Sequence, residues 1–308
     1  GLSFAGDMAK KGFSVTVFEA LHEIGGVLKY GIPEFRLPNA IVDVEIENLQ
    51  KMGVKFITDC IVGKTISVKN LEEQGFRGFF IGSGAGLPNF MNIPGENALN
   101  IMSSNEYLTR VNLMDAPNPH TDTPINLGTD VVVVGGGNTA MDSCRTAKRL
   151  GAEVTLVYRR SEAEMPARLE EVKHAKEEGI NFMTLHNPKE YEADEKGAVK
   201  AVVLDVMQLG EPDASGRRRP EATGETITLE CDQVIVAVGV SPNPLVPQSI
   251  EGLELGRKNT IAVNDQMQSS IEEIYAGGDI VRGGATVILA MGDGRKAALN
   301  MSEKLLKK

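Results

Sequence analysis

A glycine-rich turn follows a strand-like run near the middle of the chain. Residues 131–134 are four valines, and the spacing Gly-x-Gly-x-x-Ala that comes next opens a helical pattern. In such a turn the first glycine allows the bend, the second lets backbone approach a pyrophosphate, and the small third residue lets helix pack on strand. The helix N-terminus then offers N–H groups and partial positive charge to the phosphates. The pattern predicts a dinucleotide site, the alternative being a tight structural turn. Its residues are Gly135, Gly137, Asn138, Thr139 and Ala140.

The end of the next predicted strand, residues 153–158, indicates which dinucleotide binds. A site for NAD places an acid there to accept hydrogen bonds from the ribose 2′-hydroxyl. In this chain Tyr158 takes that position and Arg159 and Arg160 follow it. Two guanidinium groups suit a 2′-phosphate, which arginine binds in a bidentate manner. We therefore predict NADPH, the alternative being two solvated surface arginines.

The same helix–turn–strand unit occurs a second time, at the start of the sequence. Residues 1–19 repeat the pattern of residues 140–158, with Glu19 at the position of Tyr158. An acid at this strand end is expected to bind an adenosine ribose; a solvated glutamate is the alternative. Gly1 falls where the third glycine of a nucleotide turn would lie, and the strand and glycines before it are missing, so we expect an N-terminal truncation.

Two more segments carry features of a ligand site. Gly25 and Gly26 follow the first predicted strand and permit close backbone approach to a ligand. Near the C-terminus, Gly278 and Asp279 end a strand, and an apolar helix begins shortly afterwards. This second segment places an acid and a helix N-terminus near a ligand.

The elements that position these residues alternate between strands and helices. Short apolar runs closed by glycine predict strands of a parallel sheet buried on both faces, at residues 79–81, 131–134, 234–238 and 274–276. Residues 38–52 and 166–178 have helical patterns. A Pro-rich polar stretch at 115–124 resembles a linker, and 210–226 resembles a long polar hairpin tip. The predicted fold class is α/β.

Composition excludes several classes of protein. The 308 residues suggest two domains, and the formal net charge of −10 excludes a global basic footprint for nucleic acid or anionic membrane. The basic run at 217–219 lies among acidic residues, so nucleic acid is not expected there either. With no run of 18 apolar residues and no signal peptide, we expect a cytoplasmic protein without a membrane partner.

Histidine and cysteine spacing predicts neither a catalytic base nor a metal site. The four histidines form no known catalytic spacing. The three cysteines, Cys60, Cys144 and Cys231, contain no C-x-x-C, which argues against a disulfide relay. We expect them to be small buried hydrophobes.

Four motifs together resemble the glutamate synthase small (beta) subunit family. They are GGVLKYGIPEFRLP at residues 25–38, GGGNTAMD at 135–142, YRR at 158–160 and EMPAR at 164–168. The family includes the NADPH-binding subunit of electron-bifurcating ferredoxin:NADP oxidoreductase, also known as sulfide dehydrogenase. The resemblance covers essentially the whole chain.

The resemblance implies two Rossmann-like dinucleotide-binding domains, with the NADPH domain inserted into the FAD domain. Residues 1–122 would be the first part of the FAD domain with its first strand missing, 123–244 the NADPH domain, and 245–308 the C-terminal part of the FAD domain.

The resemblance also implies roles for single residues. Glu19 would bind the FAD ribose, and the backbone at Val62 would meet the adenine. Gly278 and Asp279 would hold the ribityl–pyrophosphate part, and Thr286 and Val287 would border the isoalloxazine. Gly84 and Gly239 would end the strands that connect the domains. The cofactor-binding set is completed by Gly1, Gly26, Leu28 and Arg36.

By this resemblance the chain is a flavin-dependent module that passes hydride from NADPH to FAD. Electrons would continue through iron–sulfur clusters to a large catalytic subunit, as in glutamate biosynthesis, or to a ferredoxin-type acceptor. The family's cysteine-rich iron–sulfur segment is not in this sequence, so no cluster is expected within it. One alternative is a nucleotide-binding or assembly fragment without independent turnover, and another is the NADPH-binding subunit of a ferredoxin:NADP oxidoreductase. A self-contained flavin reductase would need a substrate pocket that the sequence does not reveal.

Overall fold

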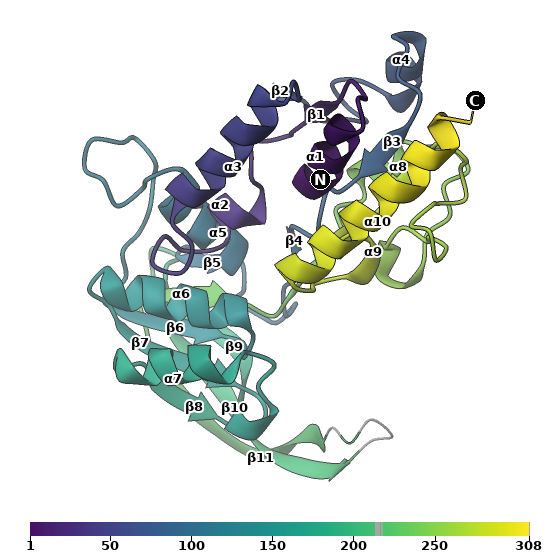
Figure 1. Cartoon of the computed structure of the whole chain (residues 1–308). Helices are drawn as coiled ribbons and strands as arrows, with labels where there is room; N and C mark the ends of the chain where they lie inside the picture. The colour runs from purple at the N-terminus through teal and green to yellow at the C-terminus, as the bar shows by residue number, and fades with distance from the viewer. Residues whose placement is uncertain (213–215, 217, 308) are drawn as a thin grey trace. The chain divides into compact units, whose positions relative to one another are not determined.

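The chain divides into two compact units in the computed structural model, which describes residues 1–212, 216 and 218–307 (Figure 1). Unit 1 consists of Gly1–Lys29, Leu37–Leu87 and Val240–Lys308, and unit 2 consists of Tyr30–Arg36 and Pro88–Gly239. Unit 2 is therefore inserted into the chain of unit 1. Both units combine helices with parallel strand pairs, which confirms the predicted α/β class.

Unit 2 is built on a five-stranded sheet in which every neighbouring pair is parallel. Its order is β5–β12–β6–β7–β8. The strands are β5 (Ile101–Ser103), β6 (Asp130–Val134), β7 (Glu153–Tyr158), β8 (Asn181–Thr184) and β12 (Gln233–Val236). The valine run lies in β6, where Val131 and Val133 face one core cluster while Val132 and Val134 face another. Because both faces of the sheet are covered, the strand is apolar throughout.

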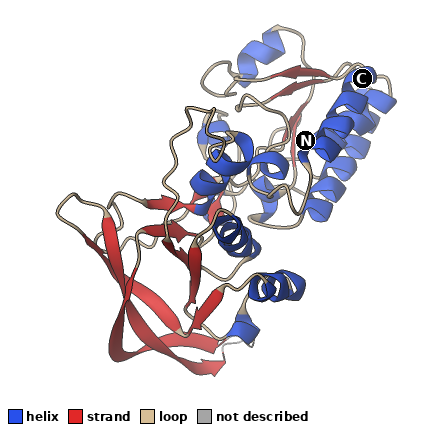
Figure 2. Cartoon of the chain, turned by 90° about the vertical axis from the view of Figure 1, so that its left-hand side faces the viewer, coloured by secondary structure: helices blue, strands red, loops and turns tan. Residues whose placement is uncertain are grey.

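Helices cover one face of this sheet and an antiparallel sheet covers the other. The helices are α5 (Ser104–Leu108), α6 (Asn138–Arg149) and α7 (Leu169–Glu177). On the opposite face lie β9 (His186–Ala193), β10 (Val199–Pro212) and β11 (Arg218–Glu230), seen as long red arrows in Figure 2. Tyr191, Val202 and Leu204 of these strands pack against the valines. The sequence predicted only a polar tip at 210–226, of which 213–215 and 217 lie outside the described residues.

The longer segment of unit 2 begins at Pro88, whereas the resemblance implied that the NADPH domain starts at residue 123. The reason is long-range strand pairing, since β5 forms a parallel pair with β12. Unit 2 also ends at Gly239 rather than at residue 244.

Unit 1 contains two parallel strand pairs. Strand β1 (Thr16–Phe18) pairs with β2 (Lys55–Ile57), and β3 (Phe79–Ile81) pairs with β14 (Ile274–Ala276). Helices α1 (Leu2–Lys10) and α10 (Val287–Leu305), from opposite ends of the chain, lie side by side (Figure 1). They share a core cluster in which the Phe4 ring stacks on Phe80 with 4.4 Å between ring centroids.

The bounds of the two predicted helices agree with the structure to different degrees. Helix α3 (Asn39–Lys51) confirms the prediction over 38–52. The predicted start at residue 166 is wrong, because α7 begins at Leu169 and Arg168 before it is extended, with φ −64° and ψ 141°. Pro166 therefore lies in the extended approach to the helix rather than in its first turn. Likewise the strand predicted over 234–238 ends at Val236.

The remaining short elements complete the chain. They are α2 (Val27–Tyr30), α4 (Val68–Glu73), β4 (Leu87–Pro88), the π-helical turn η1 (Thr109–Leu113), the 3₁₀ turn η2 (Glu162–Glu164), β13 (Val240–Ser241), α8 (Leu245–Gln248), the 3₁₀ turn η3 (Arg257–Asn259) and α9 (Asp279–Arg282). Among the described helices, none combines the length and the apolar character needed to cross a membrane.

Candidate functional site

The turn between β6 and α6 has the geometry that a pyrophosphate requires. Gly135 has φ +143°, and a Cβ there would lie 2.3 Å from the carbonyl oxygen of Ala237. At Gly137 the same test finds no atom within 4 Å, so the backbone is open to a ligand. Ala140 is fully buried against the sheet. The three positions thus have the three properties expected of them.

The N-terminus of α6 is free to bind an anion. Gly137 caps the helix without a side-chain hydrogen bond, so the first turn keeps N–H groups that lack an intrahelical acceptor. Asn138 points its side-chain oxygen elsewhere, accepting from the Arg168 N–H at 2.9 Å. Thr139 is exposed at the surface. These groups and the helix dipole together favour phosphate.

The end of β7 presents the two predicted arginines in different ways. Arg159 is exposed and makes no hydrogen bond or ion pair with any described residue. Arg160 is half-buried, and its Nε donates to the carbonyl oxygen of Arg218 at 3.0 Å. Tyr158 is buried and donates from its hydroxyl to the Glu164 carbonyl oxygen at 2.9 Å. The tyrosine therefore supports the turn, Arg159 is exposed, and Arg160 is held in part by its contact with the backbone.

A buried ion-pair network lies behind α6. Nη1 of Arg36 contacts both carboxylate oxygens of Asp142 at 2.6 and 2.7 Å, and its Nε lies 3.2 Å from Glu171. Arg145 extends the network to Glu171 at 2.8 Å. Burial raises the pKa of the Asp142 carboxyl to about 6, and the Arg36 charge opposes that shift. These contacts are structural, and a cofactor role for Arg36 stays a prediction.

In unit 1, Glu19 lies directly after β1. Its N–H donates to the Ile57 carbonyl, and its Oε1 accepts from the Leu21 N–H at 3.0 Å. Gly26 has φ +54° with no atom within 4 Å of a Cβ position, so the loop after Glu19 is open. Leu28 packs into the core cluster around Val42, which makes its side chain a structural one. Glu19 and Gly26 therefore remain the ligand-facing candidates of this loop.

The second part of the unit 1 site is the turn after β14. Gly278 has φ +80°, and its N–H donates to Oδ2 of Asp293 at 3.0 Å. Arg282 holds the same carboxylate through two contacts of 2.7 Å. Asp279 accepts from the Ala285 N–H at 3.1 Å, and burial raises the pKa of its carboxyl. The Asp293 carboxylate thus holds the turn through Gly278 and Arg282. The sequence did not single out this residue.

The other predicted positions of unit 1 lie at the N-termini of helices or outside the named helices and strands. Thr286 caps α10 by accepting from the Leu289 N–H at 3.4 Å, and Val287 is 42% exposed. Gly1 caps α1, and Val62 bridges to Ile66. Gly84 has φ +70° in open surroundings.

Gly239, the last residue of unit 2, has φ +105°. Its carbonyl oxygen accepts from the Asn89 N–H at 3.0 Å. Gly239 lies between the end of β12 and the start of β13, and it ties the end of unit 2 to the start of that unit's longer segment.

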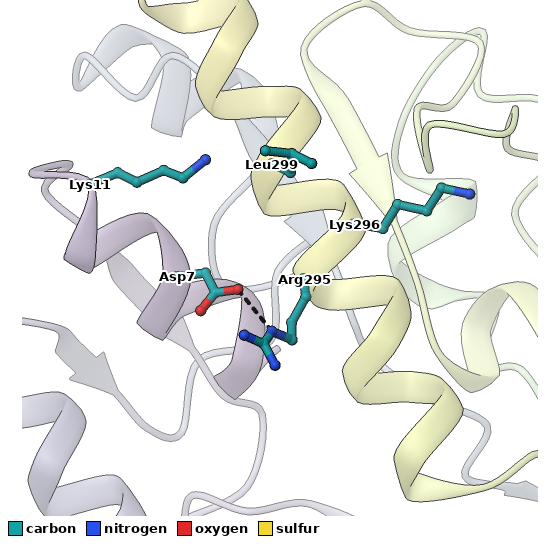
Figure 3. A pocket seen from close by; sticks show the side chains of 5 residues that line it. All are labelled: Asp7, Lys11, Arg295, Lys296 and Leu299. Carbon is teal, nitrogen blue, oxygen red and sulfur yellow. Dashed lines mark hydrogen bonds and ion pairs between the residues drawn. The ribbon is translucent and has the colours of Figure 1, made fainter.

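A surface groove between α1 and α10 contains none of these residues (Figure 3). Its lining includes Lys11 and Arg295, whose charged groups are engaged with Ser302 at 2.6 Å and Asp7 at 3.2 Å. The groove is therefore a packing feature of two helices and lies away from the predicted chemistry.

The sequence pattern of the pyridine nucleotide-disulphide oxidoreductase family matches residues 1–294. The chain belongs to this family. Membership supports the predicted cofactors, FAD and NADPH, and the predicted class, an NADPH-dependent flavin oxidoreductase.

Two relatives show which members of the family the chain is similar to. The chain is 36% identical to a putative glutamate synthase [NADPH] small chain of Cereibacter sphaeroides, over 99% of this chain and 74% of that protein. This confirms the resemblance found in the sequence. It is 39% identical to the beta subunit of an NADP(+)-dependent formate dehydrogenase of Moorella thermoacetica, over 99% of this chain and 42% of that protein. The chain thus spans less than half the length of the Moorella relative.

A solved structure shares the fold of the whole chain. The structure of FprA of Mycobacterium tuberculosis in complex with NADPH superposes with a TM-score of 0.82 at 19% identity, over all of this chain and 83% of that one. This likeness confirms the fold expected of the family.

The disulphide in the family's name has no counterpart in this chain. Cys60, Cys144 and Cys231 are all buried and unpaired. Burial raises the pKa of the Cys144 thiol far above its usual range, so it stays protonated and unreactive.

Proposed function

We propose that this chain is an NADPH-to-FAD hydride-transfer module, with NADPH bound at residues 135–160 of unit 2 and FAD bound by unit 1. Electrons would leave through iron–sulfur clusters to a partner subunit. When bound, the two cofactors supply the hydride chemistry themselves. The chain's residues bind and orient them.

The observation that carries the proposal is the pairing of an open phosphate turn with an unengaged arginine. Gly137 leaves space for backbone approach, and Arg159 extends from the adjoining strand end with no described partner. Arg160 has one nitrogen engaged, by the Arg218 carbonyl. A pyrophosphate and a 2′-phosphate together need this combination, and NADPH has both groups.

The residues of unit 1 likewise offer an open backbone and available polar groups, which suit FAD. Gly26 leaves the backbone open after β1, and Glu19 has a carboxylate oxygen to spare for a ribose hydroxyl. Asp279 stands at the turn held by Asp293, next to the cap of α10. In this arrangement Glu19 would orient the adenosine and Asp279 the ribityl–pyrophosphate part.

A partner subunit is supported by the names of the relatives. The Moorella relative is a beta subunit and the Cereibacter relative a small chain. We infer that the acceptor is either a large catalytic subunit or a ferredoxin-type protein. The likeness to the Cereibacter small chain favours a large catalytic subunit.

The test is the visible absorption spectrum of the full chain with added FAD, before and after anaerobic NADPH. We expect flavin bands that remain after desalting and bleach with NADPH, and much less with NADH. Retained flavin that NADPH does not bleach would overturn the hydride-transfer proposal. If no flavin is retained and NADPH still binds, the chain is a nucleotide-binding fragment.

A further inference from the structure

A third arginine reaches the end of β7 from a different part of the chain. Arg218, the first residue of β11, accepts the hydrogen bond from Arg160 through its carbonyl oxygen. Its own Nε donates to Oε1 of Glu164 at 3.1 Å. The guanidinium of Arg218 is therefore held beside the residues that follow β7, although 58 residues separate Arg160 from Arg218 in sequence.

Resting on the proposed function, we propose that Arg218 is a specificity-determining residue that binds the 2′-phosphate of NADPH together with Arg159 and Arg160. The Arg218 side chain is 43% exposed, and Glu164 is its only partner among the described residues. An arginine has five N–H donors, so its terminal nitrogens remain available to a phosphate.

Glu164 makes the third arginine necessary. Its carboxylate is 15% exposed and is fixed by Ser161, whose Oγ donates to Oε2 at 3.0 Å. Burial on its own would raise the pKa of this carboxyl, but hydrogen bonds from Ser161 and Arg218 hold it below its ordinary value. A fixed anion beside the site would repel a phosphate unless a cation neutralised it.

The charges then match the ligand. Three arginines and one carboxylate leave a net charge near +2, against about −1.5 to −2 on a phosphate monoester at neutral pH. Without Arg218 the net charge would fall to about +1, with Glu164 exposed to the ligand. NADH has no 2′-phosphate, so its binding should not depend on Arg218.

The chain offers a matched control in the next residue. Arg219 is exposed, and because side chains alternate along a strand it points to the other face of β11. Arg218→Gln and Arg219→Gln remove the same charge at neighbouring positions. A general electrostatic effect would therefore change both variants alike.

The experiment is a calorimetric titration of the full chain and its variants with 2′,5′-ADP and with 5′-AMP, which differ by the 2′-phosphate. We expect Arg218→Gln to weaken 2′,5′-ADP binding by about tenfold or more, the usual size of a lost hydrogen bond to a charged group. Binding of 5′-AMP should stay unchanged. Arg219→Gln should change neither ligand by more than about twofold, and thermal melting should show both variants folded.

Two results would overturn the inference in distinguishable ways. If the unmodified chain prefers 2′,5′-ADP but Arg218→Gln behaves like Arg219→Gln, Arg218 has no part in specificity and the proposed NADPH site stands. If the unmodified chain binds both ligands equally, the 2′-phosphate site itself is absent, and both proposals fail.

Discussion

The ends of β1 and β7 are the same place in two copies of one structural unit, and they carry opposite charges. Each follows a helix and a tight turn, α1 before β1 and α6 before β7. At the end of β1 stands Glu19, with one carboxylate oxygen bonded to the Leu21 N–H. At the end of β7 stand Arg159 and Arg160. In the proposed function the repeated unit would place a ribose, and the residues that follow the strand would select which ribose binds.

The two copies also differ in their strand pairing and in the burial of the ion pairs on their helices. Strand β7 has six residues and lies between β6 and β8, whereas β1 has three residues and, among the described strands, pairs with β2 alone. Helix α6 buries an aspartate and an arginine in an ion-pair network. In helix α1, Asp7 forms a more exposed ion pair with Arg295 of α10. One local pattern therefore supports two environments, and the differences can be tested in turn.

The largest expected effect comes from removing both arginines at the end of β7. Arg159→Gln with Arg160→Gln should lower the preference for NADPH over NADH by about a hundredfold or more, because two charge-assisted hydrogen bonds are lost. Titration of both nucleotides measures this, with unchanged NADH affinity as the internal control. An unchanged preference would remove the contrast with Glu19 on which the comparison depends.

An effect of comparable size is expected from the loss of the Arg36 charge behind α6. Arg36→Met leaves Asp142 buried beside fewer cations, and should lower the free energy of unfolding by about 3 kcal/mol. Arg295→Met, which removes the α10 partner of Asp7 in α1, should cost at most about 1 kcal/mol. Chemical denaturation of both variants measures the difference. Equal losses would show that the two helices are held alike.

A smaller effect is expected from the titration of Asp142, which makes the free energy of unfolding depend on pH. Its pKa is about 6 in the folded chain against an ordinary value of 3.8, so between these values the folded state keeps a proton that the unfolded state releases. The contribution to stability is therefore full below about pH 4 and is lost as the pH rises through 6.

The measurement is the difference in unfolding free energy between the unmodified chain and Asp142→Asn. From pH 4.5 to pH 7 the unmodified chain should lose about 1–3 kcal/mol of unfolding free energy relative to the variant. A relative gain in stability of the unmodified chain over this pH range would mean that the Arg36 charge, rather than burial, sets the pKa of the Asp142 carboxyl.

The smallest expected effect concerns Glu19. Glu19→Gln keeps an oxygen for the Leu21 N–H but loses the negative charge offered to the ribose, and should weaken FAD binding by about tenfold. Glu45→Gln, at an exposed position of α3, is the matched control. Flavin fluorescence during titration measures both. Equal affinities would indicate that Glu19 is a solvated residue.

Local features of this molecule were predictable from sequence, and long-range pairings were not. The turn at Gly135, the strands beside it and the helix–turn–strand repeat depend on neighbouring residues, and each formed as predicted. The pairing of Arg36 with Asp142 joins residues 106 apart, and no local pattern indicates it. The antiparallel sheet was missed for a similar reason, since most residues of β11 are exposed and give no core signal.

Three site features needed the structure. Asp293 acts through the turn at Gly278, to which the sequence does not connect it. Arg218 appeared only as part of a basic run, of which Arg217 lies outside the described residues. The late start of α7 depends on the extended backbone at Arg168.

The short segment Tyr30–Arg36 has a consequence for biosynthesis. It is translated among residues of unit 1 yet packs within unit 2, so Arg36 leaves the ribosome 106 residues ahead of its partner Asp142. The arginine that contacts both carboxylate oxygens of Asp142 in α6 thus belongs to a segment made much earlier. A gene fragment encoding Pro88–Gly239 alone would therefore express a unit that lacks the arginine its core requires.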